Sequence, residues 1–330
     1  MSIGRFVSAV ATVLLLIASV APTSGSSESW NYDRPGYTGG DVERDKLADD
    51  LTTLTVTVAD RTGNLIPNLA VTHFTVFDNG LRQKIAVFRN HEGPSGIGIL
   101  FDTSGSMKKA RFARDLARGV SLLAMRGLSS NRYFLLTFGD RLELLADWTA
   151  DQNKFLDVLN NIRPIGPTRL YDALYESIEK LKNSTYYRKV IVVLSDGEDN
   201  SSQHKLGEIR QLLAQTGVIV YSVGVADPQF ALLEAGREIL LELSRLSGGA
   251  CYLPSKVAEI RDSLISIAVE LANQYQISYF PTDSRRDGRW HKVRVEVEPL
   301  ETNDPTKPNA KPKRLPLSAR SRAGYYAPHD

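Results

Sequence analysis

Continuous apolar segments alternate with amphipathic helical segments through the middle of the chain, and this alternation restricts the fold more than any other feature. Four runs are apolar enough to be strands buried on both faces: residues 97–101, 133–138, 190–194 and 218–223. Between and after these runs, apolar residues recur at helical spacing, as they do from Val257 to Leu271. Continuous apolar strands separated by helices predict an α/β fold with a doubly wound, largely parallel sheet that is covered on both faces.

Oxygen-bearing side chains lie in three loops at the ends of these elements. Asp102, Ser104 and Ser106 directly follow the first apolar run, in GIGILFDTSGSM. Thr168 stands between a Pro/Gly-rich loop and a helical segment, and Asp196 closes the third run and opens a turn. Ligands of doubly wound sheets bind at the carboxyl ends of the strands, and hard cations such as Mg²⁺, Mn²⁺ and Ca²⁺ prefer oxygen ligands. The sequence therefore predicts a divalent-metal site made by these five residues.

Each of these residues also has a structural interpretation. Ser106 and Thr168 are typical helix N-caps, and Asp196-Gly197 is a typical turn. Their joint occurrence in this order, each at an element boundary, favours the metal site. The set resembles the von Willebrand factor A-type domain, whose metal-ion-dependent adhesion site uses D-x-S-x-S, a threonine in a second loop and an aspartate in a third. All five residues match, and the departure is Gly166-Pro167 before the threonine, where the family more often has two small residues.

The resemblance implies how the site works. In such domains an acidic side chain of a protein partner completes the coordination of the metal. Asp102, Ser104 and Ser106 would supply the first loop of ligands, Thr168 would join when the partner is bound, and Asp196 would coordinate directly or through water. The residues themselves point the same way: two carboxylates and three neutral hydroxyls do not over-neutralise a divalent ion, so an open coordination position would attract a carboxylate.

We therefore predict a non-enzymatic protein-binding or adhesion module that holds Mg²⁺, with Mn²⁺ or Ca²⁺ as alternatives. Two other functions stay open: a structural envelope scaffold whose metal only pins the loops, and a metal-dependent hydrolase in which the metal activates water. The hydrolase lacks a visible base, because His204, the nearest histidine to Asp196, is expected to be exposed at a helix start. Asp172, Glu198 and Asp199 lie near the motif and are candidates to hydrogen-bond the metal ligands.

The segments on either side of the α/β region have the texture of β-strands. Before it, apolar residues alternate with threonines from Leu54 to Val58, and the turn Asp78-Asn79-Gly80 between apolar runs indicates a hairpin. After it, residues 275–279 and 293–297 alternate in the same way, and one final strand is expected within 315–326. Neither flank alone has enough strands for an independent sandwich, so we expect the two to pair.

The predicted organisation is thus an α/β domain inserted in a small all-β, sandwich-like domain. The β domain comprises residues 48–92 and 274–330, with a Pro-rich loop at 301–313, and the A-type domain comprises residues 93–273. This arrangement resembles a family of exported bacterial proteins with an A-type domain.

The first 47 residues are predicted to lie outside both domains. Residues 1–25 have a basic residue, an apolar run and a small polar end, the layout of a secretory signal peptide, with an uncleaved anchor as the alternative. Residues 26–47 are expected to be a flexible lead. We expect an exported protein, periplasmic or extracellular, with no membrane span after signal cleavage.

Charge and cysteine content narrow the possible partners and crosslinks. The formal net charge is +2 and no concentrated basic face is visible, so nucleic acid is not an expected partner. Cys251, expected to be buried, is the single cysteine, so the chain cannot form an internal disulfide. The sequence indicates no oligomeric state.

Overall fold

The computed structural model describes residues 51–90, 93–105, 118–125, 127–151, 166–225, 233–302 and 313–329. All of them belong to one compact unit, Asp45–Asp330. The predicted signal peptide and the predicted lead, as well as Ser106 and most of the Pro-rich loop, lie outside these residues. In the described part of the chain, no helix combines the length and the apolar character that crossing a membrane would require.

A six-stranded sheet forms the centre of the α/β domain, in the order β10-β9-β8-β5-β6-β7. Its strands are β5 (Ser95–Asp102), β6 (Arg132–Phe138), β7 (Leu142–Thr149), β8 (Arg188–Ser195), β9 (Ile219–Gly224) and β10 (Cys251–Tyr252). All neighbours pair in parallel except β7, which runs antiparallel to β6. The largely parallel sheet is confirmed, and the antiparallel edge strand β7 is an addition that the sequence did not predict.

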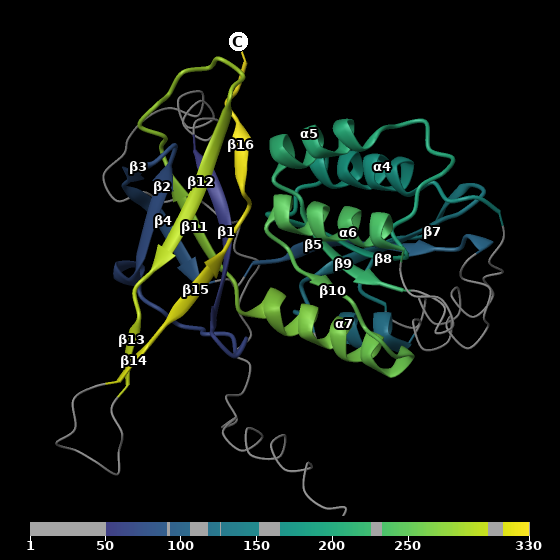
Figure 1. Cartoon of the computed structure of the whole chain (residues 1–330), viewed down its shortest axis with the longest axis horizontal. Helices are drawn as coiled ribbons and strands as arrows, with labels where there is room; N and C mark the ends of the chain where they lie inside the picture. The colour runs from purple at the N-terminus through teal and green to yellow at the C-terminus, as the bar shows by residue number, and fades with distance from the viewer. Residues whose placement is uncertain are drawn as a thin grey trace, which may run out of the picture. The chain divides into compact units, whose positions relative to one another are not determined.

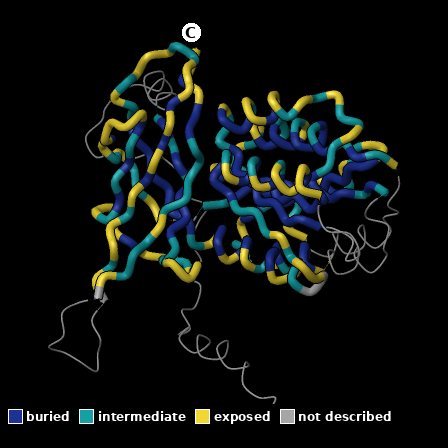
Figure 2. Tube along the Cα trace, viewed as in Figure 1, coloured by how far each residue is buried: buried dark blue, intermediate teal, exposed yellow. Residues whose placement is uncertain are grey.

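Helices cover both faces of this sheet (Figure 1). The labelled helices are α4 (Leu170–Lys182), α5 (Leu206–Thr216), α6 (Glu234–Ser247) and α7 (Val257–Ala272). Leu100 of β5 packs in one core cluster with residues of α4, α5 and α6, whereas its neighbours Ile99 and Phe101 pack in another with α7 and with helical residues 118–125. Successive residues of a strand point to opposite faces, so β5 is buried on both (Figure 2). This confirms the doubly wound arrangement.

Two four-stranded antiparallel sheets make up the β domain, in the orders β15-β1-β11-β4 and β16-β12-β2-β3. The strands before the α/β domain are β1 (Thr52–Asp60), β2 (Phe74–Asp78), β3 (Leu81–Gln83) and β4 (Ile85–Asn90), with a 3₁₀ turn, η1 (Val71–His73). Those after it are β11 (Tyr275–Tyr279), β12 (Trp290–Val297), β13 (Leu300–Thr302), β14 (Lys313–Leu315), β15 (Leu317–Arg320) and β16 (Gly324–Tyr326). Because β1 pairs with β11 and β2 pairs with β12, each sheet takes strands from both flanks, as predicted.

Two details of the β domain differ from the prediction. The hairpin exists, but its second strand is only β3, and after Lys84 the chain crosses to the other sheet, where β4 pairs with β11. Ile85 and Phe88 of β4 pack against the core of the β domain, whereas Leu81 of β3 is 54% exposed. The single strand expected within 315–326 is in fact the end of β14 together with β15 and β16, which belong to three sheets.

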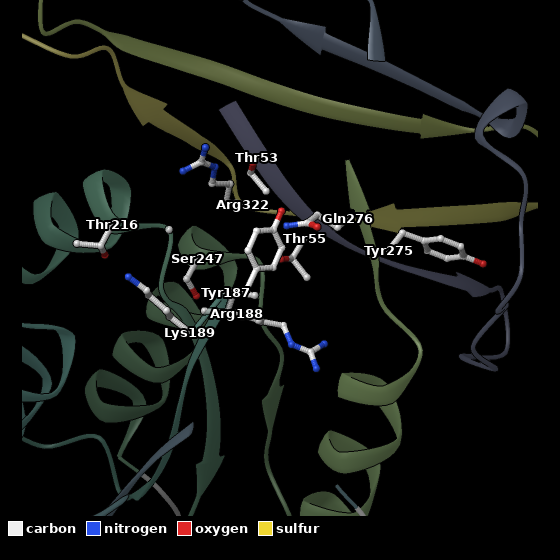
Figure 3. A pocket seen from close by; sticks show the side chains of 12 residues that line it. Thr53, Thr55, Tyr187, Arg188, Lys189, Thr216, Ser247, Tyr275, Gln276 and Arg322 are labelled. Atoms are coloured by element: carbon white, nitrogen blue, oxygen red, sulfur yellow. The ribbon is translucent and has the colours of Figure 1, made fainter. Parts of the chain in front are cut away.

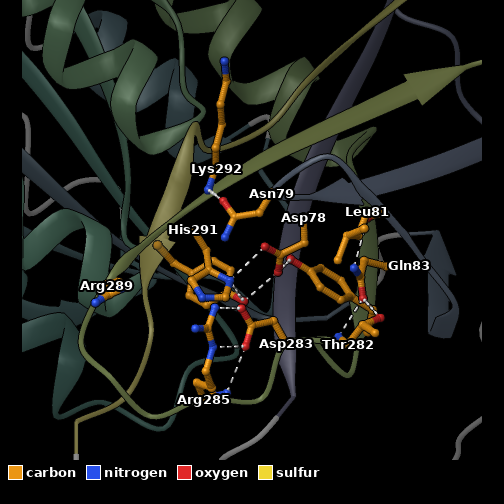
Figure 4. A network of polar contacts seen from close by, with 12 residues as sticks. Asp78, Asn79, Leu81, Gln83, Thr282, Asp283, Arg285, Arg289, His291 and Lys292 are labelled. Atoms are coloured by element: carbon orange, nitrogen blue, oxygen red, sulfur yellow. Dashed lines mark hydrogen bonds and ion pairs between the residues drawn. The ribbon is translucent and has the colours of Figure 1, made fainter.

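A buried carboxylate joins strands of both flanks inside the β domain (Figure 4). Asp78 of β2 accepts hydrogen bonds from the hydroxyls of Tyr279 and Tyr325, at 3.0 and 2.7 Å, and lies 2.9 Å from Nδ1 of His291. Asp78 and His291 are each only 3% exposed. These four residues come from β2, β11, β12 and β16, so His291 has a structural role in the packing of the two sheets.

A second buried carboxylate, Glu270 near the end of α7, contacts both domains. It accepts hydrogen bonds from Thr57 of β1 at 2.9 Å and from the hydroxyl of Tyr221 of β9 at 2.5 Å, and it forms an ion pair with Arg320 of β15. Glu270 is 5% exposed, so these contacts hold the last turn of α7 against the β domain in a region that excludes most water.

Basic side chains meet the carboxyl ends of the helices at the amino-terminal edge of the central sheet. Nζ of Lys189 donates to the carbonyl of Lys182 at the end of α4, and Nη1 of Arg188 donates to the carbonyl of Leu271 near the end of α7. Both residues help to line a cavity of about 320 Å³ (Figure 3). Cations stabilise the negative end of a helix dipole, which accounts for positive charge at this edge.

Cys251, expected to be buried, is half-buried in β10, and burial raises the pKa of its thiol to about 11.

Candidate metal centre

Four of the five predicted metal ligands gather at the carboxyl ends of β5 and β8. Asp102 is the last residue of β5, and Asp196 directly follows β8, the parallel neighbour of β5. Ser104 lies just after Asp102, and Thr168 lies just before α4. All four are buried, with exposed fractions of 0 to 8%. The fifth, Ser106, lies outside the described residues, so its place in the site stays a prediction.

The carboxylate of Asp102 is oriented from two sides. Its Oδ1 accepts a hydrogen bond from the backbone N–H of Ser104 at 2.8 Å, and its Oδ2 accepts one from the hydroxyl of Ser195 at 2.7 Å. The oxygen of Ser195 in turn accepts the N–H of Gly197 at 3.0 Å. The first loop and the end of β8 are therefore connected through this one carboxylate.

Burial raises the pKa of Asp102 to about 6, and the nearby carboxylate of Asp196 also raises it. The hydrogen bonds from Ser104 and Ser195 act in the opposite direction. Two carboxylates close together in a water-poor site repel each other, and a divalent cation between them would remove that repulsion. The donor atoms fit a hard cation because all of them are oxygens, and no cluster of three or more His, Cys, Asp or Glu residues occurs in the described ranges to offer another kind of site.

The Thr168 loop is attached to both of the other loops. The carbonyl of Gly166 accepts a hydrogen bond from the N–H of Gly105 in the first loop at 3.0 Å. Gly166 has φ of +88°, and a Cβ there would lie 2.8 Å from Cβ of Asp140, so this position requires glycine. On the other side, the N–H of Thr168 donates to Oδ1 of Asn200 at 2.8 Å. Gly166, the first residue of the Gly166-Pro167 pair before Thr168, thus has a local steric reason.

Asp199 and Ser202 cap the amino end of α4 from a distant loop. The residue before the helix, Arg169, makes no side-chain cap. Instead Oδ2 of Asp199 accepts the N–H of Tyr171 at 3.1 Å, and Oγ of Ser202 accepts the N–H of Asp172 at 3.1 Å. Ser202 also donates to Asp199 at 2.5 Å. Free N–H groups of a first helical turn need such acceptors, so this loop and α4 are stabilised together.

Asp172 has a similar role. It accepts the backbone N–H groups of Gln203 and His204, at 2.9 and 3.0 Å to Oδ1, and lies 2.9 Å from Nδ1 of His204. The His204 ring, half-buried rather than exposed as predicted, stacks on Tyr175 with centroids 3.8 Å apart. Within the described residues, the hydrogen bonds of Asp172 and Asp199 thus join a loop to a helix and do not reach the four predicted ligands.

Three residues that arrange the site were missed in the sequence: Ser195, Asn200 and Ser202. They belong to the polar run SDGEDNSS that starts at the end of β8. Glu198, a further candidate, contributes its backbone N–H to Oδ1 of Asp196 at 3.1 Å. The polar run was the available signal, but polar residues after a strand usually indicate only an exposed turn.

Comparisons with known proteins agree with this fold. Residues 97–198 match the family model described as von Willebrand factor type A domain. A protein of Borreliella burgdorferi, described as uncharacterized, is 24% identical over 213 residues, which are 61% of this chain and 61% of that protein, less than two thirds of its length.

Solved structures with similarity to the chain include three with low sequence identity. An aerotolerance-related membrane protein from Bacteroides fragilis is 17% identical, with a TM-score of 0.44 over 53% of this chain and 99% of that one. BatB from Bacteroides thetaiotaomicron is 17% identical, with a TM-score of 0.45 over 54% and 98%. Proximal thread matrix protein 1 of the mussel byssus, with a zinc-occupied MIDAS motif, is 18% identical, with a TM-score of 0.48 over 58% and 50%.

The family model covers most of β5, then β6, β7, α4 and β8, together with the loops after β5 and β8. The chain has the fold of the von Willebrand factor type A family, matched at residues 97–198, with additional antiparallel sheets formed by the segments on either side.

Proposed function

We propose that this chain is an exported protein-binding module that holds a divalent cation and uses it to bind an acidic side chain of a protein partner. The cation would be held by Asp102, Ser104, Ser106, Thr168 and Asp196. The observation that supports this best is the buried pair Asp102 and Asp196 at the ends of two parallel strands, where burial and the neighbouring carboxylate raise the pKa of Asp102. A divalent cation between the two carboxylates would offset the cost of burying their negative charge.

The chemistry of the donors supports the choice of metal. Mg²⁺ is the first choice because it prefers oxygen ligands and keeps several positions for water or an incoming group, and Mn²⁺ and Ca²⁺ are alternatives. When bound, the cation would supply positive charge at an open position. Asp102 and Asp196 would balance part of that charge, and Ser104 and Thr168 would add neutral oxygens. A carboxylate of a partner is the group that such a position attracts.

His204, the nearest histidine to Asp196, stacks on Tyr175 and lies 2.9 Å through its Nδ1 from the carboxylate of Asp172, contacts that join the loop after β8 to α4. Metal-dependent hydrolysis by the protein would distinguish the hydrolase alternative. Metal-dependent binding of a partner would distinguish the adhesion function from the scaffold alternative, in which the metal only pins the loops. Export is supported by the signal-like residues 1–25.

Metal binding is tested by thermal unfolding of the mature protein with and without Mg²⁺, Mn²⁺ or Ca²⁺. A ligand that binds only the folded state stabilises it by about 2.7 kcal/mol at 100 times its dissociation constant. We expect this gain in the wild type and in Asp262→Ala, a control on the exposed face of α7, and no gain in Asp102→Ala. An equal response of all three proteins would refute the assignment.

Partner binding is tested with proteins of the envelope fraction captured in Mg²⁺ and released by a chelator. Captured partners are then altered at single acidic residues, Asp to Asn or Glu to Gln. Loss of binding upon one such change supports the adhesion function. Metal binding without any chelator-sensitive partner supports the scaffold, and chelator-sensitive phosphatase or peptidase activity supports the hydrolase.

A further inference from the structure

Asn200 contacts both backbone groups of Thr168. Its side-chain oxygen accepts the N–H of Thr168 at 2.8 Å, and its own N–H donates to the carbonyl of Thr168 at 3.1 Å. The N–H of Ser201 donates to the same carbonyl at 3.1 Å. Thr168 is 4% exposed, so these bonds form where water is scarce and where an unpaired N–H would cost free energy.

The hydroxyl of Thr168 is the group left over by this arrangement. Both backbone groups of the residue are engaged by the loop after β8, whereas no hydrogen bond of its hydroxyl occurs within the described ranges. Fixing the backbone of a residue on both sides restricts where its side chain can point. Asn200 therefore acts on the direction of the Thr168 hydroxyl without itself being a predicted ligand.

Further hydrogen bonds join the loop around Asn200 to α4. Its neighbour Asp199 caps α4 at Tyr171, and Asp172 in the first turn of α4 binds back to the backbone at His204. The loop thus has contacts with α4 on both sides of Asn200, and the helix begins two residues after Thr168. Loop, helix start and Thr168 form one connected unit.

We propose that Asn200 is the positioning residue of the metal centre, and that it holds Thr168 in its ligating place before any partner arrives. This inference rests on the proposed function of the site. It differs from the expectation that Thr168 joins only when a partner binds, because the contacts that fix its backbone come entirely from within the chain. Residues that orient metal ligands typically change metal affinity by about 10- to 100-fold when they are replaced.

The test measures Mn²⁺ alone, by calorimetry on the full mature chain without a partner. Asn200→Ala removes the acceptor and should weaken Mn²⁺ binding by about 10-fold or more. Asn200→Asp keeps an oxygen that can accept the Thr168 N–H and should bind at least as tightly as the wild type. Ser201→Ala, the matched control, leaves the backbone N–H in place and should bind like the wild type.

A double-substitution cycle distinguishes positioning from general support of the fold. If Asn200 acts through Thr168, Asn200→Ala should weaken Mn²⁺ binding no further in a Thr168→Ala background, although it still lowers the melting temperature. Additive losses of affinity in the two variants would overturn the proposal, as would wild-type affinity in a folded Asn200→Ala protein. If that protein does not fold, Asn200→Ser, which leaves a smaller gap, takes its place in the same cycle.

Asp102→Ala in the same series separates this inference from the function on which it rests. If Asp102→Ala binds Mn²⁺ like the wild type, the metal centre itself is wrong. If Asp102→Ala loses binding while Asn200→Ala keeps it, the metal centre stands and only the positioning role of Asn200 falls.

Discussion

Replacing Asp102 with asparagine should stabilise the metal-free protein. The amide keeps the shape of the carboxylate and can still accept the N–H of Ser104, while Ser195 can accept from its NH₂ group. What disappears is a buried negative charge beside Asp196. Burial raises the pKa of Asp102 from 3.8 to about 6, a difference of about 2 units. At about 1.4 kcal/mol per unit, the charge costs the folded state about 3 kcal/mol at neutral pH.

The pH dependence has a definite sign. Below pH 3.8 Asp102 is protonated in both states, and its burial has no charge cost. Between pH 3.8 and about 6 the unfolded chain ionises first, so the folded state loses stability as the pH rises, and above about pH 6 the loss is complete. The free energy of unfolding of Asp102→Asn minus that of the wild type should therefore rise from near zero to about 3 kcal/mol across this window.

The assay is urea unfolding in the presence of a chelator, at a series of pH values from 4 to 8. Asp262→Asn, at an exposed position of α7, serves as the control and should follow the wild type. Saturating Mg²⁺ should remove much of the difference, because only the wild type gains from the cation. Parallel pH profiles of wild type and Asp102→Asn without metal would refute the reasoning.

Three further predictions concern the architecture. Residues 93–273 should unfold cooperatively as a separate fragment, because they contain the whole central sheet. A chain that ends at residue 92 should instead be disordered by circular dichroism. A cooperative melt of that shorter chain would contradict the shared β domain. Glu270→Ala should cost about 2 to 4 kcal/mol of stability in urea unfolding, since it leaves the buried hydroxyls of Thr57 and Tyr221 without their acceptor and Arg320, whose side chain is 37% exposed, without its partner. The exposed Glu234→Ala should cost less than about 1 kcal/mol, and equal costs would count against the buried contact. Gly197→Ala should lower stability by about 2 to 4 kcal/mol in the same assay, because φ of Gly197 is +81° and a Cβ there would lie 2.2 Å from a backbone oxygen of α6. A neutral effect would show that Gly197 and α6 are not packed this closely.

The sheet and the two aspartates could be predicted because both leave local marks in the sequence. Strands buried on both faces are continuously apolar, and Asp102 and Asp196 directly end two such runs. Parallel strands bring their carboxyl ends to one edge, so the meeting of the two carboxylates follows from the order of the elements. No contact between distant side chains had to be guessed.

The residues that arrange the site could not be predicted in this way. Ser195 binds Asp102 across 93 positions of sequence, and Asn200 binds Thr168 across 32. Which polar residue of a loop meets which neighbour depends on how two loops approach each other in space, and one sequence carries no direct record of that approach. For the same reason the sequence does not show that Asp172 and Asp199 join a loop to α4.

Strands with a solvated face were the other gap. β7 has exposed as well as half-buried residues, with Leu144 47% exposed, so it lacks the continuous apolar run that marks its neighbours. The crossing at Lys84 was hidden because this single residue separates β3 from β4, which belong to different sheets.

The two connections of the α/β domain have a mechanical consequence. The chain leaves the β domain at the end of β4 and returns at the start of β11, and Asn90 and Tyr275 are directly paired there. Under the proposed function, a pull on a partner bound at the metal centre would reach the β domain through these two adjacent connections as well as through the contacts of Glu270. Where such a pull runs along β11, the five residue pairs between β11 and β1 would resist it together in shear, rather than opening one after another. The two paired connections would then transmit tension between a partner and the β domain while the two ends of the inserted α/β domain stay side by side.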